Sequence, residues 1–271
     1  MRRFFVDPSE ISDSKAIVTG SEARHLVSVL RLEVGTCVQL FDGTGVTYEA
    51  EISGISKGRV EFIVSSRDEL AEMRVKLFLG QALLKGKKMD VVIQKTTELG
   101  IAGLYPFFSQ YVSVSKVTGE RAERRLERWR KISREACKQC NFPNPPRISS
   151  VSGFNEVLEK ASKLRCDMKL IFWEDEKTQS LQRVMGNVTP SSVMILIGSE
   201  GGFSANEVNM ATSAGFIPVT LGKRILRAET AAIVSTAIIQ YLSGNFDHQE
   251  FIATVRAHIF PSELFGQHQV S

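Results

Sequence analysis

The spacing of apolar residues along this 271-residue chain changes near residue 72, and this change constrains the fold most. Before it, apolar and polar residues alternate, as at Val38 and Leu40 or at Val60 and Phe62. A period of two is typical of half-buried strands. After it, short apolar runs such as residues 193–197 alternate with segments of helical periodicity. Strands that alternate with helices favour a parallel sheet covered by helices, so the chain is predicted to be an α/β protein with a β-rich first unit.

The polar segment 65–72 is predicted to separate the two units. Residues 1–72 then form a small barrel-like β domain, and residues 73–271 form the α/β domain, with a tail from about 244. One short helix is expected inside the first unit, with Ser21 as its N-cap and Leu26, Val29 and Leu30 on its apolar face.

The second unit shows five apolar runs suited to parallel strands and three clear helical segments. The helix 231–242 is apolar nearly all round, which predicts that it is buried. The expected strands are 75–79, 103–108, 169–173, 193–197 and 216–221, and the expected helices are 88–99, 120–140 and 231–242.

Charge, cysteine content and hydropathy exclude several classes of protein. The net charge of +4 is too small to indicate a nucleic-acid partner by itself. Cys137 and Cys140 form the one close cysteine pair, with no histidine at metal spacing, so neither a metal site nor a redox site is expected. The longest apolar run, 231–242, is shorter than the roughly 20 residues that span a bilayer. We therefore expect a cytoplasmic protein with no metal and no membrane partner.

A glycine-rich loop, Gly198-Ser-Glu-Gly-Gly202, follows the apolar run 193–197. Ser204 and Glu207 have the spacing of a capping box, which predicts a helix directly after this loop. Ligands of open parallel sheets bind at the carboxyl ends of strands, where the loop is expected. A phosphate-binding P-loop would end in Gly-Lys-Ser/Thr, which is absent. The pattern favours a ligand-binding loop over a plain strand–helix turn.

A second loop, Leu221-Gly-Lys-Arg-Ile-Leu-Arg-Ala-Glu-Thr230, follows the last predicted strand. It carries several charges directly before the apolar helix, and buried charges need a partner or a ligand. Two interpretations remain open here: a ligand-binding loop, or a loop that an Arg227–Glu229 ion pair merely closes. A third stretch, with Lys85, Lys87 and Lys88 around Gly86, is a basic turn that would hold RNA phosphates if it lay beside a catalytic pocket.

Together and in this order, these stretches resemble the bacterial 16S ribosomal RNA uridine N3-methyltransferase family, RsmE, of the SPOUT superfamily. The resemblance extends to about residue 243. The sequence departs from the family pattern at Ser199 and at Ala228. It also lacks the arginines that the family has near Tyr111 and near Phe142. Its further motifs are Arg2-Arg-Phe-Phe-Val6, Phe41-Asp-Gly-Thr-Gly45, Val92-Ile-Gln-Lys-Thr-Thr-Glu-Leu-Gly100 and Arg128-Trp-x-Lys-Ile-x-x-Glu-Ala136.

This resemblance implies a PUA-like β-barrel that helps to bind RNA and a C-terminal SPOUT domain whose chain threads a trefoil knot. It also implies a homodimer that methylates 16S rRNA within a small-subunit particle, with S-adenosyl-L-methionine as cofactor. The expected cofactor-binding residues are Ile197, Gly198, Gly201, Gly202, Leu221, Gly222, Ile225, Leu226 and Thr230.

Methyl transfer from a sulfonium is an in-line displacement that depends on positioning and on a dry site. Uridine N3 carries a proton, so a base or a cation near the uracil oxygens would assist. Arg227 is the expected cation, and Glu200 and Glu229 are the candidate bases. The expected RNA-binding residues are Arg2, Arg3, Arg24, Arg31, Lys85, Lys87, Lys88 and Gln94.

Two other functions stay open on the sequence. One is a SPOUT methyltransferase that acts on another rRNA or tRNA nucleotide. The other is a non-catalytic RNA-binding factor for ribosome assembly that kept the fold. A nucleotide-phosphate enzyme is disfavoured because the P-loop lysine is missing.

Overall fold

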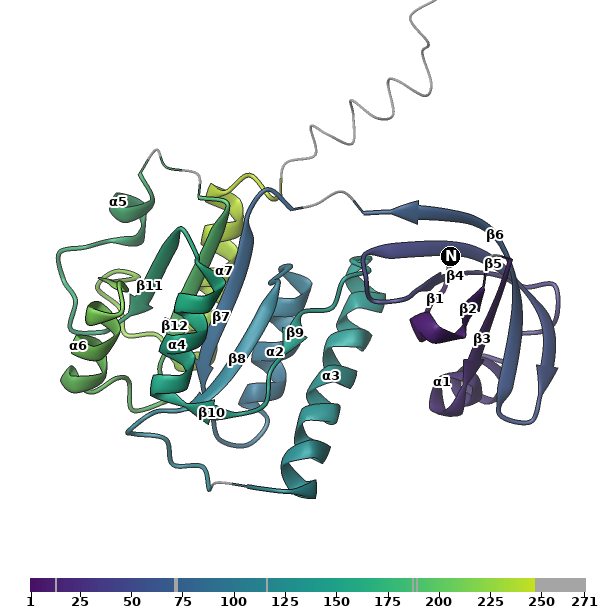
Figure 1. The fold of residues 1–271 in the computed structure, drawn as a ribbon, viewed down its shortest axis with the longest axis horizontal. Helices are drawn as coiled ribbons and strands as arrows, with labels where there is room; N and C mark the ends of the chain where they lie inside the picture. The colour runs from purple at the N-terminus through teal and green to yellow at the C-terminus, as the bar shows by residue number, and fades with distance from the viewer. Residues whose placement is uncertain (13, 71–72, 116, 187, 189, 247–271) are drawn as a thin grey trace, which may run out of the picture.

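The computed structural model describes residues 1–12, 14–70, 73–115, 117–186, 188 and 190–246. Two units lie side by side in Figure 1, a smaller β unit at the N-terminus and a larger α/β unit. Among the residues described, no helix is long and apolar enough to cross a membrane.

The N-terminal unit contains a six-stranded mixed sheet in the order β1-β4-β5-β6-β3-β2, in which only β1 and β4 are parallel. The period-two pattern is confirmed, because Phe4, Leu40, Ile52 and Phe62 are all buried in one core. The strands are β1 (Arg3–Phe5), β2 (Ile11–Ser12), β3 (Lys15–Thr19), β4 (Cys37–Phe41), β5 (Val46–Ser56) and β6 (Arg59–Glu69), and the short helices are η1 (Pro8–Glu10), α1 (Gly20–Arg24) and η2 (His25–Val29).

Two details of this unit differ from the sequence prediction. The helix begins after Thr19 rather than after Ser21, and its second half is the π-helical turn η2. Because a π turn bonds i to i+5, Leu26 and Val29 do not share a face; Leu26 is buried and Val29 is 65% exposed. In addition, the polar stretch that begins at residue 65 continues β6 to Glu69, paired by backbone hydrogen bonds with Val46. Backbone pairing does not depend on side-chain polarity, so the pattern did not reveal it.

The α/β unit contains seven parallel strands in the order β10-β8-β7-β12-β11-β13, with β9 also beside β8. The predicted strands and helices of this unit are all present, with small shifts at their ends. The strands are β7 (Lys76–Ala82), β8 (Gly103–Phe108), β9 (Arg147–Ile148), β10 (Ser152–Gly153), β11 (Met168–Phe172), β12 (Ser192–Ile197) and β13 (Ile217–Val219). The helices are α2 (Lys88–Glu98), α3 (Glu120–Cys140), α4 (Phe154–Leu164), α5 (Leu181–Met185), α6 (Ala205–Ser213) and α7 (Ala228–Leu242).

Helices cover both faces of this sheet (Figure 1). The central strand β12 is buried on both sides: Ile195 packs into the core shared with α2, α3 and α7, and Leu196 packs into the core shared with α4 and α6. A strand buried on both faces must be apolar at every position, which explains the continuous run that the sequence shows there.

Helix α7 is less buried than its composition predicts. Ala232 and Ile239 are fully buried, and the helix packs against α2 and β7. However, Tyr241 is 72% exposed, and Ile238 and Leu242 are also exposed. The prediction of a buried helix therefore holds for one side of α7 only, because apolar character does not distinguish a core from an uncovered surface.

The two units are joined at the carboxyl end of α3. The Lys138 ammonium lies 2.6 Å from a Glu22 oxygen, and both side chains are largely buried. Glu22 also accepts a hydrogen bond from the Phe5 backbone N–H at 3.2 Å, and the Arg134 guanidinium lies 5.1 Å from the centre of the Phe5 ring. These contacts fix the N-terminal unit against a helix of the second unit.

We expect Lys138→Met to lower the free energy of unfolding by about 1–2 kcal/mol, because it leaves the Glu22 carboxylate largely buried without its cation. Urea unfolding followed by circular dichroism measures this change. Lys131→Met, at an exposed position of the same helix, is the matched control and should change stability little. Equal stability of the two variants would contradict the assigned role of the joint.

Candidate functional site

A cavity of about 890 Å³ lies at the carboxyl ends of β11, β12 and β13. Three loops form it: residues 173–180 after β11, 198–204 after β12 and 220–227 after β13. Because all three strands are parallel, their ends meet at one edge of the sheet, which is where ligands bind in such folds.

The glycine-rich loop folds back on itself so closely that side chains do not fit. A Cβ on Gly198 would lie 3.0 Å from the backbone of Gly202. Gly202 has φ of +71°, a conformation that favours glycine, and a Cβ there would run into the Glu174 carboxylate. The turn is closed by the Gly202 N–H, which donates to the Ser199 carbonyl at 3.0 Å.

The predicted capping box is confirmed at the start of α6. The Glu207 N–H donates to the Ser204 hydroxyl oxygen at 3.2 Å, and the Ser204 N–H donates to Glu207 Oε2 at 3.0 Å. Glu207 is buried, and its other oxygen accepts from the Gln110 N–H at 2.8 Å. One carboxylate therefore fixes the glycine loop, the helix start and the loop after β8 to one another.

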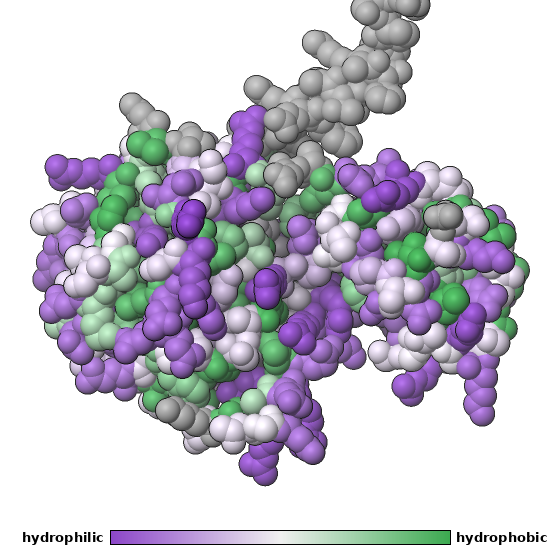
Figure 2. All heavy atoms as spheres, in the orientation of Figure 1, coloured by the Kyte–Doolittle hydropathy of each residue, from purple (hydrophilic) through white to green (hydrophobic). Residues whose placement is uncertain are grey.

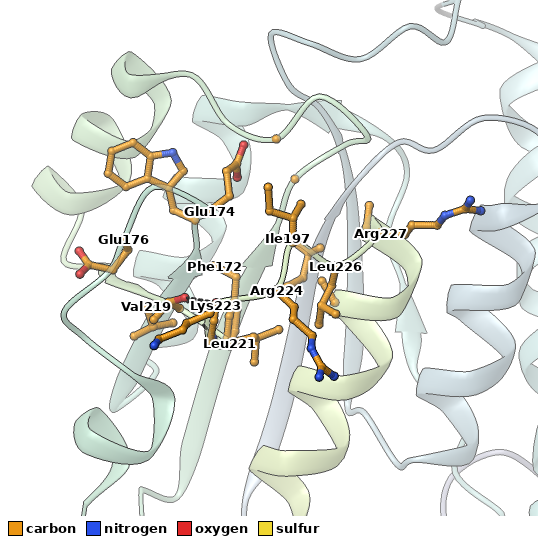
Figure 3. Close-up of a pocket in the computed structure, with 18 of the residues that line it drawn as sticks. Phe172, Glu174, Glu176, Ile197, Val219, Leu221, Lys223, Arg224, Leu226 and Arg227 are labelled. Atoms are coloured by element: carbon orange, nitrogen blue, oxygen red, sulfur yellow. Dashed lines mark hydrogen bonds between the residues drawn. The ribbon is translucent and has the colours of Figure 1, made fainter.

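The inner part of the cavity is apolar. Phe172, Ile197 and Val219 come from the three strand ends, and Leu221 and Leu226 come from the last loop (Figure 3). Phe172, Ile197 and Val219 are buried in the core, whereas Leu221 and Leu226 remain partly exposed. Two partly exposed leucines against a buried floor make a slot suited to a flat apolar group.

The rim of the cavity is charged. Lys223, Arg224 and Arg227 line it and are exposed, and in Figure 3 Arg227 points away from the apolar residues. The hydrogen bonds that Glu176 accepts from Thr178 and Gln179 lower its pKa to about 2, so this rim carboxylate is ionised at neutral pH. The rim thus presents charges of both signs to a ligand.

Glu200 connects this cavity with the basic turn before α2. Its Oε1 accepts from the Lys88 ammonium at 2.9 Å and from the Lys85 backbone N–H at 3.1 Å. Burial raises the pKa of Glu200, but the bonds from Lys88 and from the backbone N–H groups of Glu200 and Lys85 outweigh burial, so the pKa is lowered overall. A lowered pKa makes this carboxylate a weaker base.

Glu229 lies in the first turn of α7 and does not line the cavity. Its Oε2 is buried and has no hydrogen-bond partner. The structure records no ion pair between Arg227 and Glu229, two described residues, so the alternative in which this pair closes the loop is wrong. An unpartnered buried carboxylate oxygen is energetically costly.

Most of the expected cofactor residues line one cavity, although they come from two separate stretches of sequence. Gly201 and Thr230 do not line it. Gly201 instead packs against Tyr111, whose Cβ would lie 2.8 Å from an added Cβ. The expected residues that do line the cavity are Ile197, Gly198, Gly202, Leu221, Gly222, Ile225 and Leu226.

The sequence motifs predict two loops of the cavity but not its third wall. It is formed by residues after β11, including Trp173, Glu174 and Ser180. The signal was available, because strand 169–173 was expected and parallel strand ends share one edge. The segment after it, however, lacks the glycines that drew attention to the other two loops.

The expected RNA-binding residues fall into two groups. Lys88 lines the cavity, and Lys85 and Lys87 are exposed in the same turn. Gln94 is exposed on α2 but does not line the cavity. The remaining four, Arg2, Arg3, Arg24 and Arg31, belong to the N-terminal unit.

No group of three or more potential metal-ligating side chains occurs among the residues that the structure describes. Cys137 and Cys140 are free thiols on α3, and burial raises the pKa of both, which keeps them protonated at neutral pH. His248, His258 and His268 lie outside the described residues.

Comparisons with known proteins connect this geometry to RNA modification. A family model described as an RNA methyltransferase domain matches residues 71–240, and one described as an RNA methyltransferase PUA domain matches residues 18–65. The chain is similar to ribosomal RNA small subunit methyltransferase E of Bacillus subtilis, with 30% identity over 89% of this chain and 96% of that protein. The protein of the same name from Mesomycoplasma hyopneumoniae is 37% identical over 86% of this chain and 96% of its own length.

A solved structure of similar fold shows a ligand. Ribosomal RNA small subunit methyltransferase E from Neisseria gonorrhoeae, bound to S-adenosyl methionine, superposes on this chain with a TM-score of 0.77. It is 32% identical, and the match covers 89% of this chain and 98% of that one.

We expect Gly202→Ala to lower the free energy of unfolding by about 1–2 kcal/mol, because alanine is strained at positive φ. The same loss should appear when Glu174 is also changed to alanine, because the exposed Glu174 carboxylate is free to move aside and the backbone is not. Denaturant unfolding of the four proteins in this cycle measures both values. Disappearance of the loss in the Glu174→Ala background would show that crowding, not backbone strain, requires the glycine.

Proposed function

The chain belongs to the RNA methyltransferase family, and from this membership we propose that it transfers a methyl group from S-adenosyl-L-methionine to N3 of a uridine in 16S rRNA. The observation that carries the proposal is the cavity at the ends of β11, β12 and β13, which joins a glycine loop, an apolar slot and a charged rim. The Neisseria gonorrhoeae relative, at 32% identity, binds S-adenosyl methionine.

The cavity fits this cofactor in size and in chemistry. Its volume lies within the range of about 300–1,000 Å³ found for small-molecule sites. Leu221 and Leu226 would hold the flat adenine, and the backbone of Gly198 and Gly202, bare of side chains, would approach the polar parts closely. The ionised rim carboxylate of Glu176 suits a ligand with a positive charge and hydroxyl groups. The bound cofactor supplies an activated methyl group.

We propose that Arg227 stabilises the acceptor. Deprotonation of N3 places negative charge on the uracil oxygens, and a cation at the edge of a water-poor cavity lowers the energy of that charge. Arg227 lines the rim at the start of α7, where the positive end of the helix dipole adds to the same field.

Glu200 and Glu229, the two candidate bases, differ in their hydrogen-bond partners and in their position relative to the cavity. The lowered pKa of Glu200 and its bond to Lys88 favour a positioning role, in which it holds the basic turn against the glycine loop. Glu229 keeps an unpartnered oxygen but lies off the cavity lining. We retain Glu229 as the candidate base only for a site that is completed by another molecule.

We also propose the two-domain division at 72/73 and the trefoil knot in the second domain. The path of the chain supports the knot. Strand β13 lies at the sheet edge beyond β11, yet the next helix, α7, packs against β7 and α2 on the other side of β12. The connecting loop 220–227 meets the loop 198–204 at the cavity on this return path.

A homodimer is the finer proposal for the assembly. The exposed apolar residues of α7, Ile238 and Tyr241, and Ile225 on the cavity rim, which is 88% exposed, provide a surface for a second copy. A second copy there would lie beside the cavity and near the unpartnered Glu229. We further propose that the substrate is a small-subunit particle in the cytoplasm, since the target is ribosomal RNA.

Purified protein, radiolabelled S-adenosyl-L-methionine and isolated ribosomal subunits test the proposal. We expect label in 16S rRNA, recovered as N3-methyluridine, and none in large-subunit RNA. A SPOUT enzyme for another nucleotide would place the label elsewhere. A non-catalytic assembly factor would bind RNA without any transfer of label.

We expect Arg227→Ala to keep the fold and the affinity for S-adenosyl-L-methionine, and to reduce kcat on small-subunit RNA by about 100-fold or more. Arg227→Lys should retain part of the activity because it keeps the charge. Lys223→Ala, at an exposed position of the same rim, is the control and should change kcat much less. Unchanged turnover by Arg227→Ala would exclude the proposed role.

A further inference from the structure

A second hollow, of about 400 Å³, lies between the basic turn and the first half of α3. Its apolar lining includes Leu83, Leu84 and Met89 from the turn side and Val114 from the loop after β8. The first three are buried, and Val114 is partly exposed. None of the residues assigned to cofactor binding lines this hollow.

Three arginines from two successive turns of α3, Arg124, Arg125 and Arg128, line this hollow. Arg124 is 73% exposed at its side chain and pairs with Glu120, one turn earlier. The Arg125 guanidinium lies 5.9 Å from the centre of the Trp129 ring, and Arg128 pairs with Asp90 on α2. An exposed arginine held by a single surface pair exchanges that partner readily for a phosphate, which it binds bidentately.

The basic character continues along the same face of α3. Arg121 and Lys131 lie at helical spacing from Arg124 and are exposed. The whole helix carries eight Lys and Arg residues against four Glu residues. Figure 2 shows hydrophilic residues gathered over α3, where the surface is hollowed between the two units. This face therefore forms a positive path that leads from the second hollow towards the N-terminal unit.

The basic turn is a wall common to both cavities. Lys88 lines the first cavity and binds Glu200 there, whereas Gly86 and Met89 line the second hollow. Gly86 has φ of +60°, and no atom lies within 4 Å of where its Cβ would stand, so the turn itself leaves this wall open. Because Lys88 and Met89 are adjacent in sequence, the two cavities lie next to each other across this turn.

We propose that the second hollow binds an unpaired nucleotide of single-stranded RNA that flanks the target uridine. The base rests on the apolar lining, and Arg124, Arg125 and Arg128 hold the adjoining phosphates. Proteins recognise single-stranded RNA through splayed bases and through arginines, and this hollow offers both kinds of contact. The inference rests on the proposed function, because it assigns a subsite for the same RNA.

Arg124→Glu and Arg130→Glu form a matched pair for the test. Each removes an exposed cation of α3 that pairs with a glutamate of the same helix, but only Arg124 lines the hollow. Three quantities are measured for each protein: the affinity for S-adenosyl-L-methionine, the kinetics on small subunits, and the salt dependence of binding to transcribed 16S rRNA.

We expect Arg124→Glu to raise KM for the RNA about fivefold or more and to reduce the salt slope by about one counterion. kcat and the affinity for S-adenosyl-L-methionine should stay unchanged, and Arg130→Glu should shift KM less than about twofold. In addition, RNA carrying 4-thiouridine should crosslink to residues 83–89 in the wild type and less in Arg124→Glu.

Equal KM values for the two variants, or crosslinks confined to the N-terminal unit, would overturn the subsite. If the wild-type enzyme still methylates 16S rRNA, the proposed function holds and only the subsite is refuted. Conversely, crosslinks at residues 83–89 with no methyl transfer by the wild type would support the RNA subsite and refute the proposed activity.

Discussion

The arrangement of the α/β unit follows from the parallel pairing of β12 between β7 and β11. Burial of β12 on both faces requires an uninterrupted apolar strand, and its parallel neighbours bring their carboxyl ends to the same edge. The loops after β11, β12 and β13 are thereby forced together, although they come from positions about 25 residues apart in sequence. The sheet places the cavity, and the side chains and backbone groups of the three loops determine its chemistry.

Close packing inside these loops determines which residues they tolerate. Gly198 is required because the loop after β12 folds back onto the backbone of Gly202, and Gly202 is required because its φ is +71°. Glu207 holds the same loop to the start of α6 and to Gln110, and Glu200 holds it to the basic turn. Two carboxylates thus tie the glycine loop to the elements around it.

Much of the fold could be predicted from the sequence, because it depends on local patterns. The period-two strands, the capping box of Ser204 and Glu207 and the full extent of α3 all appear as expected. The predictions fail where contacts between residues far apart in sequence determine the structure. The wall after β11 has no glycine motif, and the exposed side of α7 carries large apolar residues, as a buried side would. The lack of an ion pair between Arg227 and Glu229 also depends on how α7 starts, with Arg227 as the N-cap and Glu229 in the first turn. The expectations of a cofactor, a uridine target and a knot rest on the family resemblance. The spacing of apolar and polar residues predicts none of them.

Three features around the start of α7 and along its exposed side lie close together in the sequence. The unpartnered oxygen of Glu229, the exposed Ile225 and the exposed side of α7 all belong to the last loop and the helix that follows it. The homodimer that we propose would cover this apolar surface.

We propose that this cavity delivers a methyl group to uridine N3 of 16S rRNA. Mass spectrometric mapping of 16S rRNA from a strain that lacks the gene tests it most directly. One N3-methyluridine should be absent from that strain, and it should return with the wild-type gene but not with Arg227→Ala. An unchanged set of methylated nucleotides in the deletion strain, or loss of a modification at another atom or in another RNA, would contradict the account.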